Sequence, residues 1–365
     1  MEFFLPTRLL TGENIVRQSA DRLAAFGSRC LIVTSGSAAR RCGALDDVCA
    51  ALQANGIAYW IYDAVRPNPS IASVLEGGKL AAEKRCDFVV GIGGGSPLDA
   101  AKVIAVSAAN PELDEKALYS MTWPREPLPV VLVGTTAGTG SEMTPVAVIT
   151  AGDGRKRSFR GDKIYAALSL GDPRYTESMP LSVTASTGVD ALAHCLESYF
   201  SKKATSVSRA FALQGAATLL EPLRTVAEGK LPTNEQRREL YEGSLLGGMA
   251  ISVTGTIFPH NLGYYLTESH GIPHGFACAA FHPALLDHAA QSVPAYSQEL
   301  YERIGCTREE LTALIRRLTP EAGIHLGQDA IDALLPRWEN ASAVKNTVGE
   351  LDLPEIRDIL RGVLL

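Results

Sequence analysis

The stretch that decides the fold is FVVGIGGGSPLDAAK, residues 88–102. Residues 88–90 begin a run with the aromatic and β-branched character of a buried strand. After three consecutive glycines comes Pro97, which suits the first turn of a helix because the N–H group that it lacks has no partner there. Ser96 and Asp99 have the S-x-x-D spacing of a helix N-terminal cap. The segment therefore predicts a strand, a tight turn and a helix in direct succession.

The three glycines of this turn allow two interpretations. Glycines let a backbone approach a phosphate closely, and the free N–H groups at the start of the helix point toward it. The alternative is a tight turn with a good cap and no ligand. The GGGS sequence alone leaves both interpretations open.

A second small-residue loop, GTTAGTGSE at residues 134–142, follows the apolar run 130–133. Its residues bury almost nothing, so their backbone and hydroxyl donors are expected to face a ligand, with a flexible surface loop as the alternative. The loop is neither a Walker motif nor the GxGxxG fingerprint. Both loops are expected at the carboxyl ends of strands, where parallel sheets bind ligands.

Outward from these loops, short apolar runs alternate with helical patterns, which is typical of a parallel sheet with crossover helices. From residue 181 onward the chain shows long segments of helical period and few convincing strands. The sequence therefore predicts a Rossmann-like α/β domain of residues 1–180 and an all-helical domain of residues 181–365. The expected strands are 30–34, 59–62, 88–90, 130–133 and 166–170, and the expected helices are 38–54, 71–84, 182–201, 207–228, 234–254, 276–291, 294–304 and 307–318.

Composition excludes several classes of function. The formal net charge of −6 argues against nucleic acid, which requires a basic face. No apolar run reaches the roughly 18 residues that span a bilayer, and the N-terminus lacks the pattern of a signal peptide. The seven cysteines include no CxxC pair, as expected for reduced thiols in a cytoplasmic protein.

Four residues suggest a metal site. Asp190 and His194 are four apart in an expected helix, so their side chains share one face. His260 and His274 each lie beside proline and glycine. A set of nitrogen and oxygen ligands suits iron or zinc rather than calcium or magnesium. Each feature alone is more often an ordinary capping, core or surface residue.

Taken together, these segments resemble the iron-containing (group III) alcohol dehydrogenase family over nearly the whole chain. The shared patterns are GGGS-x-x-D-x-x-K at 93–102, T-T-A-G-T-G-S-E at 135–142, G-x-D-A-x-x-H at 188–194 and H-x13-H-G at 260–275. The resemblance implies a fold related to dehydroquinate synthase and a homodimer. It also implies that Asp190, His194, His260 and His274 bind the metal ion, ferrous iron or alternatively zinc.

The resemblance further implies a nicotinamide cofactor, held by residues of the α/β domain. The resemblance implies most of these cofactor contacts. We add two further candidates, Ser35, which follows the first strand, and Asp99, which lies in the motif at residues 93–102. The predicted cofactor-binding residues are Ser35, Asn68, Gly94, Gly95, Ser96, Asp99, Thr135, Thr136, Thr139 and Lys156.

Two departures from the family pattern affect the expected chemistry. Where members often carry a further histidine that relays a proton, this chain has Tyr264, and His270 follows six residues later. Both residues are therefore candidate catalytic groups. Residues 34–37 are small and neutral, with Arg40 and Arg41 nearby, where NAD-preferring members often have an aspartate. An acidic residue would repel a 2′-phosphate, so its absence favours NADP over NAD.

The expected function is metal-dependent, NAD(P)-linked alcohol dehydrogenase or aldehyde reductase activity on a small, polar substrate. One alternative is a lyase resembling dehydroquinate synthase, although no cluster of basic residues for a phosphate-bearing substrate is evident. A glycerol dehydrogenase fits the intact 138–142 sequence less well. The remaining alternative is a cofactor-binding protein without turnover.

Overall fold

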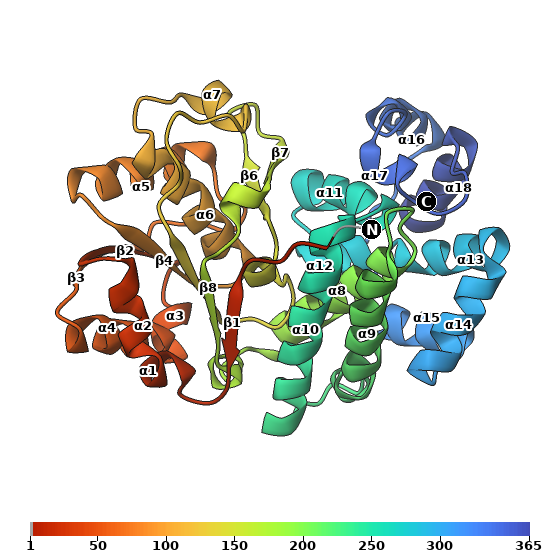
Figure 1. The fold of residues 1–365 in the computed structure, drawn as a ribbon. Helices are drawn as coiled ribbons and strands as arrows, with labels where there is room; N and C mark the ends of the chain where they lie inside the picture. Colours follow the sequence, from red (N-terminus) through yellow and green to blue (C-terminus); the bar gives the residue numbers. More distant parts are fainter. Residues whose placement is uncertain (1–2) are drawn as a thin grey trace. The chain divides into compact units, whose positions relative to one another are not determined.

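The chain divides into two units in the computed structural model, which describes residues 3–365. The first unit comprises Phe4–Met179, and the second comprises Pro180–Leu365 together with Phe3. Figure 1 shows strands and helices mixed in the first unit and helices throughout the second.

A six-stranded parallel sheet forms the centre of the first unit, in the order β1-β8-β5-β4-β2-β3. The expected Rossmann-like architecture is thereby confirmed. Sequence reasoning missed the edge strand β1 and an antiparallel hairpin, β6 with β7, outside the sheet. The strands are β1 (Arg8–Thr11), β2 (Arg29–Val33), β3 (Ala58–Tyr62), β4 (Phe88–Gly93), β5 (Val130–Gly134), β6 (Val146–Thr150), β7 (Lys156–Arg160) and β8 (Leu168–Gly171).

Both faces of this sheet are buried, as is usual for parallel strands covered by crossover helices. In β2, Leu31 and Val33 join the hydrophobic cluster beneath α5 and α6, whereas Cys30 and Ile32 join the cluster beneath α1, α2 and α4. This alternation follows the two-residue period of a strand. The helices of the unit are α1 (Ile15–Gln18), α2 (Ala20–Leu23), α3 (Ala38–Arg41), α4 (Ala44–Ala54), α5 (Ile71–Glu83), α6 (Gly95–Ala109) and α7 (Glu115–Tyr119).

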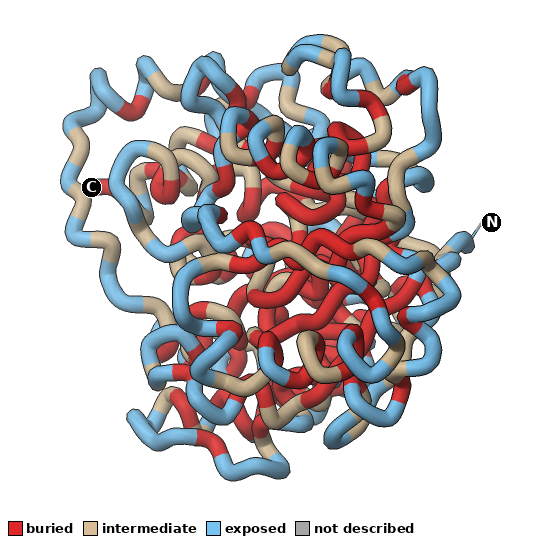
Figure 2. Tube along the Cα trace, turned by 90° about the vertical axis from the view of Figure 1, so that its left-hand side faces the viewer, coloured by how far each residue is buried: buried red, intermediate tan, exposed pale blue. Residues whose placement is uncertain are grey.

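The second unit is entirely helical in its described part, as expected. Figure 2, which colours the whole chain by burial, shows exposed residues (pale blue) alternating with buried ones (red) along the turns at the edges of the trace. No helix within residues 3–365 has both the length and the apolar composition that crossing a bilayer requires. The helices are α8 (Leu181–Tyr199), α9 (Ser206–Ala227), α10 (Asn234–Thr254), α11 (Phe258–His270), α12 (His274–Ala279), α13 (His282–Ser292), α14 (Pro294–Ile304), α15 (Arg308–Leu318), α16 (Gln328–Leu334), α17 (Ser342–Lys345) and α18 (Leu353–Leu364).

A buried lysine connects the two glycine-rich loops of the first unit. Lys102 lies on α6, the helix that follows the first loop, and is completely buried. Its Nζ donates to the backbone carbonyls of Ser141 at 2.7 Å, Thr144 at 3.0 Å and Val146 at 2.7 Å. Burial lowers the pKa of Lys102 to about 8. The helix after the first loop therefore fixes the backbone at the end of the second.

Removing this amine should destabilise the unit. In Lys102→Met, several buried carbonyls lose their donor, and each unsatisfied group costs about 1–3 kcal/mol, so we expect a loss of about 3 kcal/mol or more in the free energy of unfolding. The measurement is urea denaturation followed by circular dichroism. Lys79→Met, which removes an exposed amine, is the control and should change stability by less than about 0.5 kcal/mol. Equal stability of the two variants would contradict the anchoring role.

Candidate functional site

One face of α8 carries three buried polar residues of the second unit. Asp190, His194 and Glu197 are 3%, 5% and 0% exposed. Their spacing of four and then three residues places them on the same side of the helix. Buried charged groups are costly unless they have partners, so this face must meet compensating groups.

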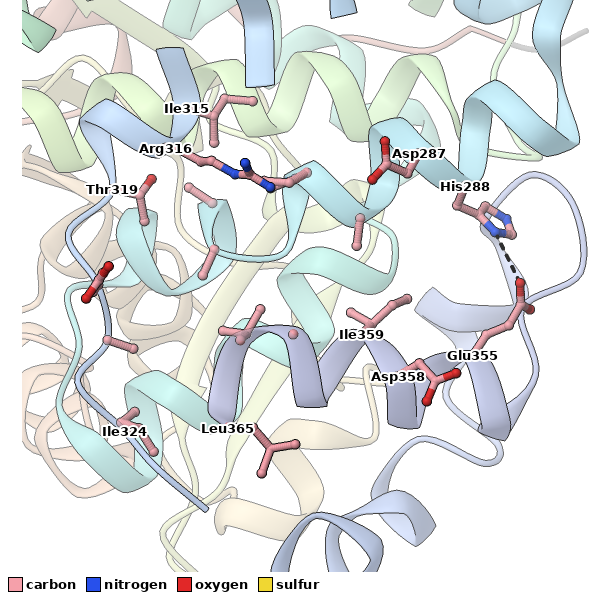
Figure 3. Close-up of a pocket in the computed structure, with 18 of the residues that line it drawn as sticks. Asp287, His288, Ile315, Arg316, Thr319, Ile324, Glu355, Asp358, Ile359 and Leu365 are labelled. Atoms are coloured by element: carbon pink, nitrogen blue, oxygen red, sulfur yellow. Dashed lines mark ion pairs between the residues drawn. The ribbon is translucent and has the colours of Figure 1, made fainter. Parts of the chain in front are cut away.

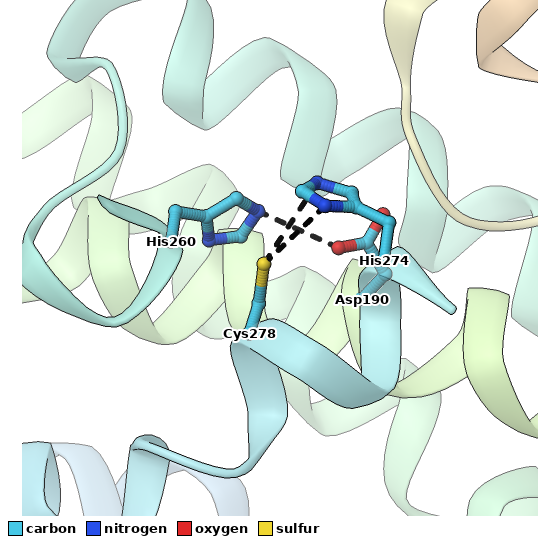
Figure 4. A group of neighbouring side chains, drawn as sticks. All are labelled: Asp190, His260, His274 and Cys278. Carbon is cyan, nitrogen blue, oxygen red and sulfur yellow. Dashed lines mark hydrogen bonds and ion pairs between the residues drawn. The ribbon is translucent and has the colours of Figure 1, made fainter. Parts of the chain in front are cut away.

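Two further helices place histidines against this face. His260 lies in the first turn of α11, and His274 is the first residue of α12. His260 Nε2 is 3.4 Å from Asp190 Oδ1, and the ring of His260 stacks on that of His194 with centroids 4.8 Å apart. The rings of His260 and His274 meet edge to face at 5.3 Å. The structure thus brings three of the predicted metal ligands, Asp190, His260 and His274, into one close group (Figure 4), and His194 adjoins this group through its ring contact with His260.

Glycine is required where these helices approach one another. A Cβ atom on Gly275 would lie 1.9 Å from the carbonyl oxygen of Ser186 on α8. A Cβ atom on Gly263 of α11 would lie 2.8 Å from Cα of Cys278 on α12. No side chain fits at either position without movement of the backbone. The glycine after His274 in the sequence motif therefore lets α12 contact α8 and bring that histidine to Asp190.

The group has the chemistry of a cation site. Within residues 3–365, Asp190 Oδ1 and His260 Nε2 are among the few buried side-chain atoms that have no hydrogen-bond partner. Buried polar atoms without partners are uncommon and require an explanation. A carboxylate oxygen and imidazole nitrogens that face one another suit a divalent transition metal ion. The residues present therefore fit the iron or zinc ion expected from the sequence.

The electrostatics of the group favour a positive charge. Burial raises the pKa of Asp190, but the nearby His194, His260 and His274 outweigh it and hold this pKa well below its usual range. Burial likewise lowers the pKa of His260, but its anionic neighbours, Glu197 among them, raise it well above its ordinary value. The surroundings thus keep Asp190 ionised and stabilise a cation beside it.

Glu197 orients His260, and sequence reasoning missed it. Its Oε1 lies 2.5 Å from His260 Nδ1, and its Oε2 accepts from the Ile257 backbone N–H at 2.7 Å. A carboxylate on one ring nitrogen directs the other nitrogen toward a metal ion. The sequence signal for Glu197 was its position seven residues after Asp190, which puts both side chains on one face of the helix. Glutamates on helices are usually exposed, so this spacing alone did not single it out.

Weakening this contact should weaken metal binding without unfolding the protein. Glu197→Gln keeps the size of the side chain and removes the charge that holds His260, so we expect the metal dissociation constant to rise about 10–100-fold. The measurement is competition with a chelator, with circular dichroism to verify the fold. Glu242→Gln, at an exposed position on α10, is the matched control. An unchanged dissociation constant in Glu197→Gln would refute the orienting role.

The two candidate catalytic residues lie in different surroundings. The ring of Tyr264 stacks on that of His274 with centroids 5.7 Å apart, and burial raises the pKa of Tyr264 to about 12. His270 is the exposed last residue of α11, ten residues or about 15 Å of helix beyond His260. Its ring contacts Tyr265 at 5.3 Å. The structure therefore brings Tyr264, and not His270, to the metal-ligand group.

In the first unit, the predicted cofactor-binding loops lie side by side. β2, β4 and β5 are adjacent in the sheet, and the segments at residues 35, 94–96 and 135–139 follow their carboxyl ends. A Cβ atom on Gly94 would lie 3.0 Å from Thr136 Oγ1, and one on Gly95 would lie 2.8 Å from Thr139 Cγ2. The first turn of α6 begins here, so its free N–H groups and the loop hydroxyls can converge on a phosphate.

The remaining predicted cofactor residues surround these loops. The backbone N–H of Asn68 donates to Ser96 Oγ at 3.3 Å, and its carbonyl accepts from Thr150 Oγ1 at 3.2 Å. Thr150 pairs with Lys156 across the β6–β7 hairpin, which brings that lysine near the loops.

Ser35 and Asp99 differ in how they could serve a cofactor. Ser35 forms a bridge with Ala64 just after β2. Asp99 uses both carboxylate oxygens within the protein, accepting from Ser141 Oγ at 2.6 Å and from the Val148 backbone N–H at 2.8 Å. Its contribution to a cofactor site is therefore to hold the second loop in place.

A separate cavity of about 900 Å³ lies in the helical unit among α13, α15, residues 319–325 and α18 (Figure 3). None of the predicted site residues lines it. Some of its charged side chains pair within the protein: Glu355 lies 3.8 Å from His288, and Asp287 lies 3.4 Å from Arg308. The metal-ligand group described above is therefore the better candidate for chemistry.

Comparison with known proteins identifies the family. The model of iron-containing alcohol dehydrogenases matches residues 6–173, and the model of the C-terminal part of this family matches residues 184–333. The chain belongs to the iron-containing alcohol dehydrogenase family and is an oxidoreductase that acts on alcohols. The resemblance inferred from the sequence motifs is confirmed.

Individual relatives agree with this assignment. The chain is 31% identical to the 1,3-propanediol dehydrogenase of Klebsiella pneumoniae over 340 residues, 88% of this chain and 86% of that protein. It is also 31% identical to the NAD-dependent methanol dehydrogenase of Bacillus methanolicus over 277 residues, 75% and 72% of the two chains. The crystal structure of an iron-containing alcohol dehydrogenase from Thermotoga maritima superposes with a TM-score of 0.91 at 34% identity, covering 99% of each chain.

Proposed function

We propose that this protein transfers a hydride between a nicotinamide cofactor and a small, polar alcohol or aldehyde. The observation that carries the proposal is the pair of buried atoms, Asp190 Oδ1 and His260 Nε2, which face each other at 3.4 Å without hydrogen-bond partners. A divalent ion, ferrous iron or alternatively zinc, would be held by Asp190, His194, His260 and His274.

Each part of the protein would have a definite task. When bound, the metal ion supplies Lewis acidity at the substrate oxygen, and the nicotinamide ring carries the hydride. Asp190 and the histidines position that oxygen, and Glu197 holds His260 in the required orientation. The loops at residues 94–96 and 135–139 bind the cofactor phosphates. Alcohol and NAD(P)⁺ then give aldehyde, NAD(P)H and one proton.

The identity of the cofactor depends on residues 34–37. This segment has no acidic side chain to repel a 2′-phosphate, and the Arg41 guanidinium lies against Ser37 Oγ within it. These features support acceptance of NADP. The Bacillus methanolicus relative is NAD-dependent. We therefore propose that NADP is accepted alongside NAD and favoured over it, which parallel assays with both cofactors would decide.

The substrate and the assembly are proposed by analogy. The relatives that act on 1,3-propanediol and methanol support a short, polar alcohol or the corresponding aldehyde as the substrate. The family resemblance supports a homodimer. The seven cysteines are all free thiols, which suits a reducing compartment such as the cytoplasm.

The first test is metal-dependent turnover. Metal-free enzyme should be inactive, and reloading with ferrous iron or zinc should restore oxidation of NADPH or NADH with short neutral, hydroxylated or anionic aldehydes. His274→Ala should lose most bound metal and most activity while remaining folded, because one ligand is missing. His325→Ala, which removes an exposed histidine, is the control. Full turnover by the metal-free enzyme would refute the metal role, and no turnover under any condition would favour a lyase or a binding protein.

We further propose that Tyr264 relays the proton that leaves the substrate hydroxyl. It stacks on His274, whereas His270 lies exposed at the end of α11. Tyr264→Phe should lower kcat about 100-fold and change its pH dependence, within the range for loss of a general acid–base group, while metal content stays the same. Tyr301→Phe is the control, because its hydroxyl has no hydrogen-bond partner in the described chain. If only His270→Ala produced these effects, the relay would pass through His270 instead.

A further inference from the structure

We propose that the thiolate of Cys278 is a ligand of the same metal ion and can take the coordination position of His194. This inference rests on the proposed metal site and extends it with a residue that the sequence motifs did not single out. One ligand atom from each of Asp190, His260, His274 and Cys278 lies within 4.8 Å of all the others. His194 adjoins this tight group through its ring contact with His260.

The distances agree with coordination of one ion. Cys278 Sγ lies 3.6 Å from Nδ1 and 3.8 Å from Nε2 of His274. When two ligand atoms bind one tetrahedral ion with ordinary bond lengths, a nitrogen and an oxygen lie about 3.4 Å apart, and a nitrogen and a sulfur lie about 3.6 Å apart. The 3.4 Å between His260 Nε2 and Asp190 Oδ1 matches the first value, and the contact of Cys278 with His274 matches the second.

The fold holds the thiol in this place. Cys278 follows His274 by four residues on α12, so both side chains lie on one face of the helix. The residue is completely buried, and its backbone is fixed against α11 at Gly263. Figure 4 shows the sulfur atom pointing between the rings of His260 and His274.

Another buried cysteine shows what an ordinary core thiol looks like in this protein. Cys195 directly follows His194 on α8 and is 1% exposed. Its sulfur packs against two glycines, Gly215 on α9 and Gly247 on α10. A Cβ atom added to Gly215 would lie 2.7 Å from the sulfur, and one added to Gly247 would lie 3.3 Å from it. Cys195 thus fills a helix interface, whereas Cys278 belongs to the group that contains Asp190 Oδ1 and His260 Nε2, two buried atoms without hydrogen-bond partners.

A thiolate ligand would change which metal ion the site prefers. It adds a soft, negatively charged donor to a set of nitrogen and oxygen ligands, and soft sulfur ligands favour zinc over harder cations. Cys278 is therefore expected to raise the affinity for zinc more than that for ferrous iron. It also provides a fourth ligand when His194 is absent.

The decisive experiment is titration of the full-length, metal-free protein with cobalt(II) as a spectroscopic probe. The wild type should bind one equivalent and show a near-ultraviolet thiolate-to-cobalt charge-transfer band. Cys278→Ser should still bind cobalt but lose the band, and its zinc affinity should fall at least about tenfold relative to its iron affinity. Cys195→Ala, the matched buried control, should keep the band. His194→Ala should keep both the bound cobalt and the band.

A second measurement avoids substitution altogether. X-ray absorption of the zinc-loaded wild type should show one sulfur neighbour at about 2.3 Å. If the wild type binds no cobalt or zinc, the proposed metal site itself fails. If metal binds with no charge-transfer band and no sulfur neighbour, or if the band survives in Cys278→Ser, the site stands and Cys278 is not a ligand.

Discussion

The interaction on which the helical unit depends is the burial of two carboxylates, Asp190 and Glu197, on one face of α8. Removing an ionised carboxylate from water costs several kcal/mol unless nearby groups compensate for it. Glu197 is compensated within the protein by a backbone N–H group and by His260 and His282. This requirement fixes where α11 begins. The backbone N–H of Ile257, directly before the helix, and the ring of His260, in its first turn, must both reach Glu197.

Lys102 in the first unit and Asp190 in the second are both buried charged residues, but their polar atoms are satisfied in different ways. Lys102 donates to three carbonyls of its own chain and has no capacity left for a ligand. Asp190 is different, because its Oδ1 is buried beside His260 Nε2 and neither atom has a hydrogen-bond partner within the described residues. A stable fold tolerates such a pair when another group, here the proposed metal ion, completes it. Lys102 is therefore an anchor, and Asp190 belongs to a functional site.

The sequence predicted those features that depend on local period and on residue type. Alternating strand and helix patterns indicated the parallel sheet, and the spacing of Asp190 and His194 indicated a shared helix face. It could not show that Lys102 of the first motif holds the second loop, since that contact joins residues about forty positions apart. Glu197 and Cys278 were missed because an isolated glutamate or cysteine in a helix is usually an exposed or a packing residue. Only the crossing of α11 and α12 brings these two residues to the site.

The candidate metal ligands and the predicted cofactor-binding loops are held in place by separate contacts. Every candidate metal ligand comes from α8, α11 and α12, and the spaces between these helices are fixed by Gly263 and Gly275. Every predicted cofactor residue belongs to the first unit, where Asp99 and Lys102 hold the second loop. Substitutions in the helical unit can therefore change the metal preference of the proposed site without touching the residues that we propose to bind the cofactor phosphates. This division explains how Tyr264 and Cys278 could alter the chemistry beside the metal while the glycine-rich motifs keep the pattern of the family.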